Sequence, residues 1–319
     1  MQYVRLGASS LKVSRLSLGA MGFGDKAWRS WVLDLDASRA VFRRALDHGI
    51  NLVDTCDYYS SGRSEEIVGA LLKETTRADL IVATKAGNPM APGPNARGYS
   101  RKHLFEAVDA SLRRLGTDYI DLYQTHIWDK ETNLPEMMEA LNDLVRAGKV
   151  LYLGITDMPF WQFASAYFHA ERRGRANFVS VQNHYNLLWR EDERELLPFC
   201  RAQGIGLIPY SPIARGFLVR RDKGTERAST DDFTYKLYGR ASDQAVTDAV
   251  AALAQRRGAT PAQIALAWVL AQPGVISPIF GPTRPEHVDE AVSALSLALT
   301  PEERKELEAP YQPRPGSRP

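Results

Sequence analysis

Residues 100–124 read Ser-Arg-Lys-His-Leu-Phe-Glu-Ala-Val-Asp-Ala-Ser-Leu-Arg-Arg-Leu-Gly-Thr-Asp-Tyr-Ile-Asp-Leu-Tyr-Gln. Apolar residues recur every three or four positions from Leu104 to Leu115, which predicts a helix with one buried face, and Ser100 is suited to cap its N-terminus. Residues 119–124 then form a short, nearly continuous apolar run, as expected for a strand buried on both faces. This stretch therefore predicts one helix followed by one strand, and the fold depends on how often that unit repeats.

Short apolar runs of this kind occur eight times along the chain. The eight candidate strands are 16–20, 51–54, 80–84, 119–124, 150–154, 177–181, 204–208 and 275–279. Most intervals between them are amphipathic and long enough for a helix. Eight alternating units in 319 residues predict an α/β fold of the (β/α)8 TIM barrel type, with the whole chain, residues 1–319, forming a single domain.

Additional elements are expected at both ends of the chain. Tyr3–Gly7 and Leu11–Ser14 alternate around a Gly/Ser turn, which predicts an N-terminal β-hairpin that closes the barrel floor. Thr260 and Thr300 are each followed by proline and, three residues on, by Gln or Glu. This pattern predicts two extra C-terminal helices that start with capping boxes.

A doubly wound α/β sheet is the competing architecture. Its dinucleotide-binding fingerprint is missing, because the glycines at Gly19, Gly22 and Gly24 do not have the G-x-G-x-x-G spacing and do not open a helix directly. Residues 86–99 and 209–241 lack a clear period. We expect them to be rim loops of the barrel that set substrate choice.

The composition is that of an ordinary globular protein, with 44% hydrophobic and 24% charged residues. Lys and Arg number 40 and Asp and Glu 38, a net charge of +2, which is too even for binding nucleic acid or an anionic membrane. No apolar run reaches the ~18 residues of a membrane span, and the first residues do not resemble a signal peptide. We expect a cytoplasmic monomer or homo-oligomer whose partner is a small molecule.

Cysteine usage and ligand spacing exclude two further classes. Only Cys56 and Cys200 are present, so no disulfide framework is indicated. Histidine, cysteine and acidic residues are not grouped with the spacing of metal ligands, so no metal is expected.

Four reactive side chains follow three consecutive candidate strands. Asp54 ends the second strand, Lys85 follows the third and His126 the fourth, while Tyr59 lies five residues beyond Asp54. Each alone has an ordinary structural explanation, but the C-terminal ends of barrel strands converge on one rim. A lysine held by Asp54 would lower the pKa of the Tyr59 phenol, and His126 would donate to a substrate oxygen. The set suits protonation of a developing oxyanion.

These residues lie in longer motifs that resemble the aldo-keto reductase family. The motifs are Asp54-Thr55-x-x-x-Tyr59, Gly62-x-Ser64-Glu65, Thr84-Lys85, Asp118-Tyr119-Ile120-Asp121-Leu122-Tyr123-Gln124-x-His126 and Leu144-x-x-Ala147-Gly148-Lys149. They cover nearly the whole chain and are most similar to the bacterial branch of aryl-alcohol-dehydrogenase-like reductases. The resemblance implies a (β/α)8 barrel that reversibly reduces an aldehyde or ketone with NADPH. It also implies a catalytic quartet of Asp54, Tyr59, Lys85 and His126, with Tyr59 as proton donor.

The resemblance further implies positions for NADPH or NADP+. Gln182 and Thr156 would contact the nicotinamide carboxamide, Tyr210 would stack on the nicotinamide ring, and Arg284 with His287 would bind the adenosine 2′-phosphate. The segment 211–216 would fold over the pyrophosphate. The full set of implied cofactor contacts is Met21, Gly22, Asp54, Thr156, Gln182, Tyr210, Ser211, Ile213, Arg215, Gly216, Gly281, Thr283, Arg284, His287 and Glu290.

Three positions depart from the family pattern. Thr156-Asp157 stands where Ser-Asn is usual, which leaves the second carboxamide contact open. Glu290-Ala291 stands where Glu-Asn is frequent, which removes an amide near the adenine. Ser60 replaces the usual glycine after Tyr59.

The substrate and two rival functions stay open. Substrate contacts are expected from Trp28, Tyr59, His126 and Trp128. As a first rival, Lys85 could form a Schiff base in a lyase or aldolase of the same barrel class. As a second, the chain could be a cofactor-sensing regulatory subunit with negligible turnover.

Overall fold

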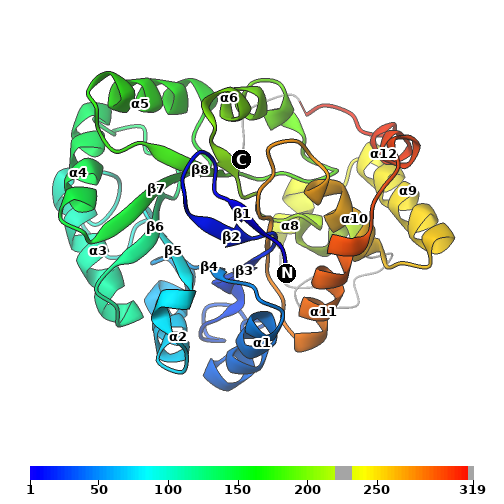
Figure 1. Ribbon diagram of the computed structural model, residues 1–319, viewed down its shortest axis with the longest axis horizontal. Helices are drawn as coiled ribbons and strands as arrows, with labels where there is room; N and C mark the ends of the chain where they lie inside the picture. The colour runs from blue at the N-terminus through cyan, green and yellow to red at the C-terminus, as the bar shows by residue number, and fades with distance from the viewer. Residues whose placement is uncertain (220–231, 315–319) are drawn as a thin grey trace.

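The computed structural model describes residues 1–219 and 232–314. Within these residues, eight parallel strands form one curved sheet in the order β10-β3-β4-β5-β6-β7-β8-β9 (Figure 1). The strands are β3 (Ser17–Gly19), β4 (Leu52–Asp54), β5 (Ile81–Ala86), β6 (Ile120–Thr125), β7 (Val150–Thr156), β8 (Phe178–Gln182), β9 (Gly206–Leu207) and β10 (Ile279–Phe280). The predicted number and order of strands are confirmed, and the fold is a (β/α)8 barrel.

The barrel closes between β9 and the segment that leads into β10. Ile276 N donates to Leu207 O at 2.8 Å, so the two edges of the sheet are hydrogen-bonded to each other. The predicted limits of the eighth strand, 275–279, are wrong, because β10 begins only at Ile279. Pro278 has no N–H to donate and interrupts the ladder just before that residue.

Helices surround the strands on the outside of the barrel (Figure 1). Those in the described residues are α1 (Leu35–Asp47), α2 (Arg63–Leu72), α3 (Arg101–Leu115), α4 (Leu134–Arg146), α5 (Phe160–Arg172), α6 (Leu196–Gln203), α8 (Asp232–Leu237), α9 (Ala241–Arg257), α10 (Pro261–Leu270), α11 (Pro285–Ser293) and α12 (Pro301–Glu308). The predicted starts are confirmed: Ser100 accepts a hydrogen bond from His103 N, and Thr260 and Thr300 each form a capping box. Local capping chemistry therefore sets where these helices begin.

An antiparallel hairpin precedes the barrel, as predicted. Its strands are β1 (Tyr3–Arg5) and β2 (Lys12–Ser14), drawn in dark blue over the centre of the ring of strands (Figure 1). Leu6 and Val13 are buried in a small apolar cluster with Leu52, the first residue of β4. The hairpin thus covers the N-terminal ends of the strands, which leaves the opposite end for a ligand.

The two predicted rim loops differ in their regularity. Residues 87–99 connect β5 to α3 without helix or strand. The segment 209–241 is more regular than predicted, because it contains a 3-10 helix over Ala214–Val219 and α8, whereas its residues 220–231 lie outside the described part of the chain. In the described residues, none of the helices combines the length and apolar character needed to cross a membrane.

Candidate active site

A lysine and an aspartate form a buried ion pair at the C-terminal ends of two neighbouring strands. Asp54 is the last residue of β4, and Lys85 lies near the end of β5. Lys85 Nζ is 2.6 Å from Asp54 Oδ1 and 2.9 Å from the carbonyl oxygen of Thr55, and Lys85 has no exposed surface. Burial is the largest single effect and lowers the pKa of Lys85, but the charge of Asp54 and its hydrogen bond, together with Tyr59 and Cys56, outweigh burial and leave the pKa above its ordinary value. The lysine is therefore held as an ammonium.

Two glutamine side chains hold the other oxygen of the aspartate. Gln182 Nε2, at the end of β8, donates to Asp54 Oδ2 at 2.8 Å, and Gln124 Nε2, in β6, donates at 3.0 Å. Both carboxylate oxygens thus have partners, which fixes the side chain. Gln182 is one of the predicted cofactor contacts, whereas Gln124 is a new member of the site. Its side chain reaches across the barrel, and no local sequence pattern signals that contact.

Tyr59 lies in a tight turn beside the ion pair. Its Oη is 3.3 Å from Lys85 Nζ, which also lies 4.8 Å from the centre of the phenol ring. Ser60 and Ser61 have φ angles of 52° and 54°, in the left-handed region that glycine usually occupies. Asp25 N donates to Ser60 Oγ at 2.8 Å, so the serine that replaces the family's glycine also tethers the turn.

Tyr59 keeps its proton at neutral pH. Burial raises the pKa of Tyr59, the charge of Lys85 lowers it, and the net direction is upward. The predicted lowering of this pKa by the lysine is therefore right for the lysine's own effect and wrong for the net value. Burial destabilises the phenolate by more than the charge of Lys85 stabilises it. A protonated phenol held against an ammonium is a proton donor.

His126 faces the tyrosine from the end of β6. The rings of His126 and Tyr59 are edge to face, with centroids 5.8 Å apart. Burial and the charge of Lys85 lower the pKa of His126 to about 3, so the ring is neutral at neutral pH. Its Nδ1 lies 2.7 Å from Asn88 Nδ2 and 3.0 Å from Cys56 Sγ. Asn88 belongs to a segment without sequence periodicity, and nothing in that segment signals its contact.

A second group of predicted cofactor contacts lies at the ends of β7, β8 and β9. Thr156, the last residue of β7, is buried, and among the described residues its hydroxyl has no hydrogen-bond partner. Tyr210 Oη donates to Asp157 Oδ2 at 2.8 Å, and the Tyr210 ring stacks on His184 with 5.2 Å between centroids and 9° between planes. Asp157 and His184 thus fix the plane of the Tyr210 ring.

The segment 211–216 has an unusual backbone. Left-handed φ angles of 55°, 50° and 56° occur at Ser211, Ala214 and Arg215. Such conformations cost on the order of 1–3 kcal/mol in non-glycine residues and cluster at functional sites. Arg215 Nε donates to Thr234 Oγ1 of α8 at 3.1 Å, and Ile213 packs against the apolar core. The segment is therefore held in a defined shape at the rim.

The residues expected near a 2′-phosphate gather at the start of α11. Arg284 is the exposed N-cap residue, and its Nη2 lies 3.1 Å from His287 Nε2 in the first turn. Thr283 N donates to His287 Nδ1 at 3.3 Å. Glu290 lies further along α11, where its carboxylate accepts a hydrogen bond from Thr260 Oγ1 at 2.6 Å. Glu290 is therefore already engaged with the N-terminus of α10.

The remaining predicted contacts lie on the rim after β3, β6 and β10. Met21 and Gly22 follow β3, and Gly281 follows β10, which pairs with β3. Trp28 and Trp128 are half-buried in the loops after β3 and β6. The structure thus brings the three glycine and methionine positions to one part of the rim.

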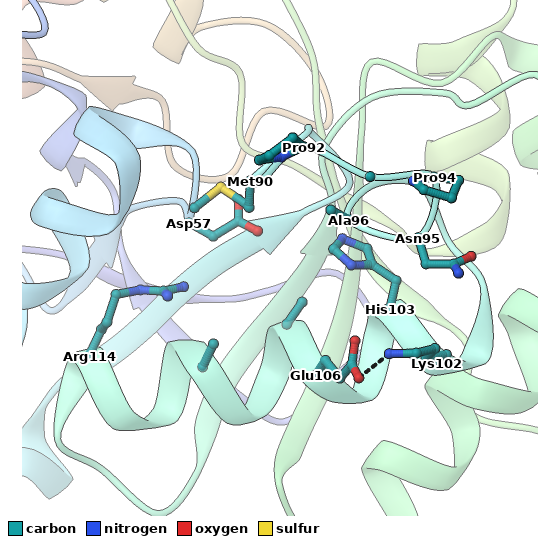
Figure 2. A pocket seen from close by; sticks show the side chains of 13 residues that line it. Asp57, Met90, Pro92, Pro94, Asn95, Ala96, Lys102, His103, Glu106 and Arg114 are labelled. Carbon is teal, nitrogen blue, oxygen red and sulfur yellow. Dashed lines mark hydrogen bonds and ion pairs between the residues drawn. The ribbon is translucent and has the colours of Figure 1, made fainter.

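A separate cavity of about 440 Å³ lies between α3 and the loop after β5. Figure 2 shows the Lys102–Glu106 pair on the helix side and Met90 on the loop side. Asp57 lies among the lining residues, two positions before Tyr59, and burial raises its pKa to about 7. None of the four predicted catalytic residues lines this cavity, so it is distinct from the ion pair at the barrel rim.

Comparison with known proteins assigns the chain to a family. Residues 15–312 match the model of the Aldo/keto reductase family. The chain is 43% identical over 345 residues to the versiconal hemiacetal acetate reductase of Aspergillus parasiticus, covering 100% of both proteins. It is 40% identical over 342 residues to the aldo-keto reductase AMT2 of Alternaria alternata, covering 98% of this chain and 92% of that protein.

A third relative carries an aryl-alcohol dehydrogenase name. The chain is 39% identical over 341 residues to a Schizosaccharomyces pombe protein provisionally named aryl-alcohol dehydrogenase C977.14c, covering 98% of this chain and 96% of that protein. These relatives are fungal, so the resemblance to a bacterial branch stays a prediction. The family match and the identity over the full chain show that this protein belongs to the aldo/keto reductase family.

Proposed function

We propose that this protein reduces an aldehyde or ketone to an alcohol with NADPH, in a reversible reaction within a single-domain barrel formed by residues 1–319. The observation that carries the proposal is the contact of the half-buried Tyr59 with the buried Asp54–Lys85 pair, with the neutral ring of His126 beside it. Bound NADPH would supply the hydride that adds to the carbonyl carbon. The protein must then supply a proton to the oxygen.

Tyr59 is the group placed to give that proton. It is protonated at neutral pH, because burial raises its pKa, and its Oη lies 3.3 Å from the ammonium of Lys85. As the proton leaves, the positive charge of the Lys85 ammonium stabilises the negative charge that develops on the Tyr59 oxygen. Asp54 keeps the lysine charged and in place throughout. The neutral imidazole of His126 would orient the carbonyl oxygen by hydrogen bonding.

The groups after β7 and β8 fit a nicotinamide ring. The buried Thr156 hydroxyl without a partner among the described residues suits a carboxamide. Gln182 donates through Nε2 to Asp54 Oδ2 and to Gln124 Oε1. Its Oε1 is an amide oxygen, which can accept a hydrogen bond from a carboxamide N–H. The fixed plane of Tyr210 suits stacking on a flat heterocycle.

The start of α11 favours NADPH over NADH. A helix N-terminus carries partial positive charge, and Arg284 and His287 add cationic and hydrogen-bonding groups at the same place. A 2′-phosphate would form charge-assisted hydrogen bonds there, whereas the 2′-hydroxyl of NADH would gain much less binding free energy. The pyrophosphate would lie along residues 211–216 with Arg215.

The substrate that we propose is an aromatic or similarly bulky apolar carbonyl compound. Trp28 and Trp128 lie in loops on the rim, and the relatives include one protein named as the reductase of versiconal hemiacetal acetate and one provisionally named an aryl-alcohol dehydrogenase. Flat apolar side chains favour ligands with aromatic surface.

The Schiff-base alternative is disfavoured by the same contacts. A lysine that forms a Schiff base must lose its proton, and such lysines have a lowered pKa. Lys85 instead has a raised pKa and lies 2.6 Å from Asp54. The regulatory-subunit alternative predicts negligible turnover, so a measurement of turnover separates it from the proposed function.

The test is a panel of aryl and alkyl aldehydes and ketones, each with NADPH and with NADH, followed by the loss of cofactor absorbance. The proposal predicts turnover with at least the aryl carbonyls and a lower KM for NADPH than for NADH. Tight NADPH binding without turnover on any member would support the regulatory reading instead. Equal KM values for the two cofactors would overturn the role given to Arg284.

A further inference from the structure

The Nδ1 atom of His126 lies against the side chains of Asn88 and Cys56. Asn88 Nδ2 lies 2.7 Å away, and an amide nitrogen donates but does not accept, so Nδ1 must present its lone pair. Cys56 Sγ lies 3.0 Å from the same atom, but its single hydrogen is directed to Asp57 Oδ1 at 3.3 Å and its sulfur can also accept, so Asn88 alone sets the direction at Nδ1. A neutral imidazole whose Nδ1 accepts must carry its hydrogen on Nε2.

We propose that Asn88 is a positioning residue that holds His126 in the Nε2–H tautomer, so that Nε2 donates a hydrogen bond to the carbonyl oxygen of the substrate. This inference rests on the proposed function and adds a residue to it. In the opposite tautomer, Nε2 would present a lone pair to an oxygen that gains negative charge during reduction. The ring would then repel the transition state instead of stabilising it.

The loop that carries Asn88 is anchored at its neck beside the histidine. Gly98 N donates to Gly87 O at 2.9 Å, which closes the loop just before and after its outer part. The Tyr99 hydroxyl accepts from Ile127 N at 3.1 Å and donates to Ile127 O, and Ile127 directly follows the histidine. These hydrogen bonds therefore hold the backbone next to Asn88 and the backbone next to His126 in a fixed arrangement.

Glycine is required at the position before the asparagine. Gly87 has a φ of 134°, and a Cβ added there would lie 2.7 Å from Tyr99 Cζ. Close contact of the Tyr99 ring with the bare backbone thus sets the direction in which Asn88 leaves the strand. In the outer part of the loop, Pro92 and Pro94 line the cavity beside α3 (Figure 2).

Among the groups around the histidine, Asp57 changes charge near neutral pH, whereas Tyr59, Cys56 and Lys85 do not. Tyr59 and Cys56 stay protonated because burial raises their pKa values, and Lys85 stays charged because the combined effect of its neighbours, Asp54 foremost, raises its pKa despite burial. Asp57 contacts Cys56, with a distance of 3.3 Å from Sγ to Oδ1, and burial raises its pKa to about 7. Because Asp57 titrates in the same range, the pH profile is read together with the NMR tautomer of His126, which reports on the histidine alone.

The decisive variant is Asn88→Asp, because a carboxylate accepts where the amide donates. The introduced carboxylate would accept a hydrogen bond from Nδ1–H and so favour the Nδ1–H tautomer of neutral His126, and its charge would raise the pKa of that ring. At low pH the imidazolium carries hydrogens on both nitrogens, so Nε2 still donates. As pH rises the ring loses the Nε2 hydrogen, and kcat/KM should fall by about 10²-fold, the loss typical for one oxyanion donor.

The control and the second variant separate this from a structural effect. Asn95→Asp places the same charge in the exposed outer part of the same loop and should leave the pH profile of the wild type unchanged. Asn88→Ala removes the donor without adding an acceptor and should lower kcat about tenfold at all pH values, with little change in the KM for NADPH. A purely structural role would affect Asn88→Ala and Asn88→Asp alike, with no pH-dependent difference between them.

Nitrogen-15 NMR of the histidines reports the tautomer without any turnover. The expected result is an Nε2–H signature for His126 in the wild type and an Nδ1–H signature in Asn88→Asp. An Nδ1–H signature in the wild type, or an unchanged tautomer in the variant, overturns the inference even if the protein reduces carbonyls. Conversely, the expected tautomers in a protein that reduces no carbonyl would leave Asn88 assigned and overturn the proposed function alone.

Discussion

Replacing Lys85 with methionine should destabilise the whole protein and not only abolish turnover. The substitution keeps much of the side chain's volume but removes the ammonium from Asp54 Oδ1, which Lys85 Nζ contacts at 2.6 Å. Lys85 is 0% exposed and Asp54 3% exposed, so water cannot replace the lost partner. The aspartate would be left as a buried charge with hydrogen bonds from Gln124 and Gln182 on its other oxygen only.

The size of the effect follows from burial. Removing one partner of a buried ion pair costs about 3–5 kcal/mol, because the remaining charge stays desolvated. With an unfolding entropy of about 2.1 cal/mol/K per residue, 319 residues give about 0.7 kcal/mol per degree, so Tm should fall by about 4–7 °C. Acid should relieve part of this cost, because a protonated carboxyl group brings no charge into the core.

The assay is urea unfolding of three variants, Lys85→Met, Asp54→Asn and the double variant. The double variant contains no buried charge, so it should regain most of the stability lost by Lys85→Met and lie within about 1–2 kcal/mol of the wild type. All three should lack normal turnover, which separates stability from chemistry. The reasoning fails if Lys85→Met unfolds within about 1 kcal/mol of the wild type, or if the double variant is no more stable than Lys85→Met.

Three further predictions test other parts of the structure. Arg284→Ala should raise the Kd for NADPH about 10- to 100-fold, the value of one charge-assisted hydrogen bond, and leave NADH binding unchanged; equal effects on both cofactors would contradict the 2′-phosphate site. Gly87→Ala should lose about 1–3 kcal/mol more stability than Gly93→Ala, because both glycines have φ near 133° but only Gly87 has Tyr99 against it. Asp57→Asn should flatten the pH dependence of stability: the pKa of Asp57 is raised from 3.8 to about 7 by burial, so the folded state of the wild type binds the extra proton and loses stability as pH rises through that interval. Equal slopes in the two proteins would contradict this account.

The barrel was predictable because each strand and each helix has a sequence pattern that can be recognised locally. Apolar runs mark the strands, and the caps at Ser100, Thr260 and Thr300 mark helix starts, so neither inference needs a distant residue. The eighth strand was misplaced because the apolar run 275–279 satisfies the pattern of a strand, while Pro278 prevents regular pairing until Ile279.

The site was predictable where its residues end strands, and not where they meet across the barrel. Asp54, Lys85 and His126 follow strands directly, so topology alone brings them together. Gln124 lies within its strand like any buried residue, and Asn88 lies in an aperiodic loop. Their partners are 70 and 38 positions away, and only the folded chain brings them into contact.

The sign of the Tyr59 pKa shift also needed the structure. The lysine's charge and the phenol are both visible in the sequence, and together they predict a lowered pKa. The burial of Tyr59 is not visible there, and it outweighs the lysine. For reduction this outcome is favourable, because the group must arrive protonated.

The central claim is that Tyr59 gives the proton in carbonyl reduction with NADPH. Tyr59→Phe removes only the hydroxyl that lies 3.3 Å from Lys85 Nζ, so the turn and the ring contact with His126 should persist. The direct measurement is the rate of NADPH oxidation in a single turnover with an active aryl carbonyl, alongside the Kd for NADPH. The account predicts a rate lower by about 10²- to 10⁴-fold with a Kd that changes by no more than about twofold. Full turnover by Tyr59→Phe with NADPH bound would contradict it.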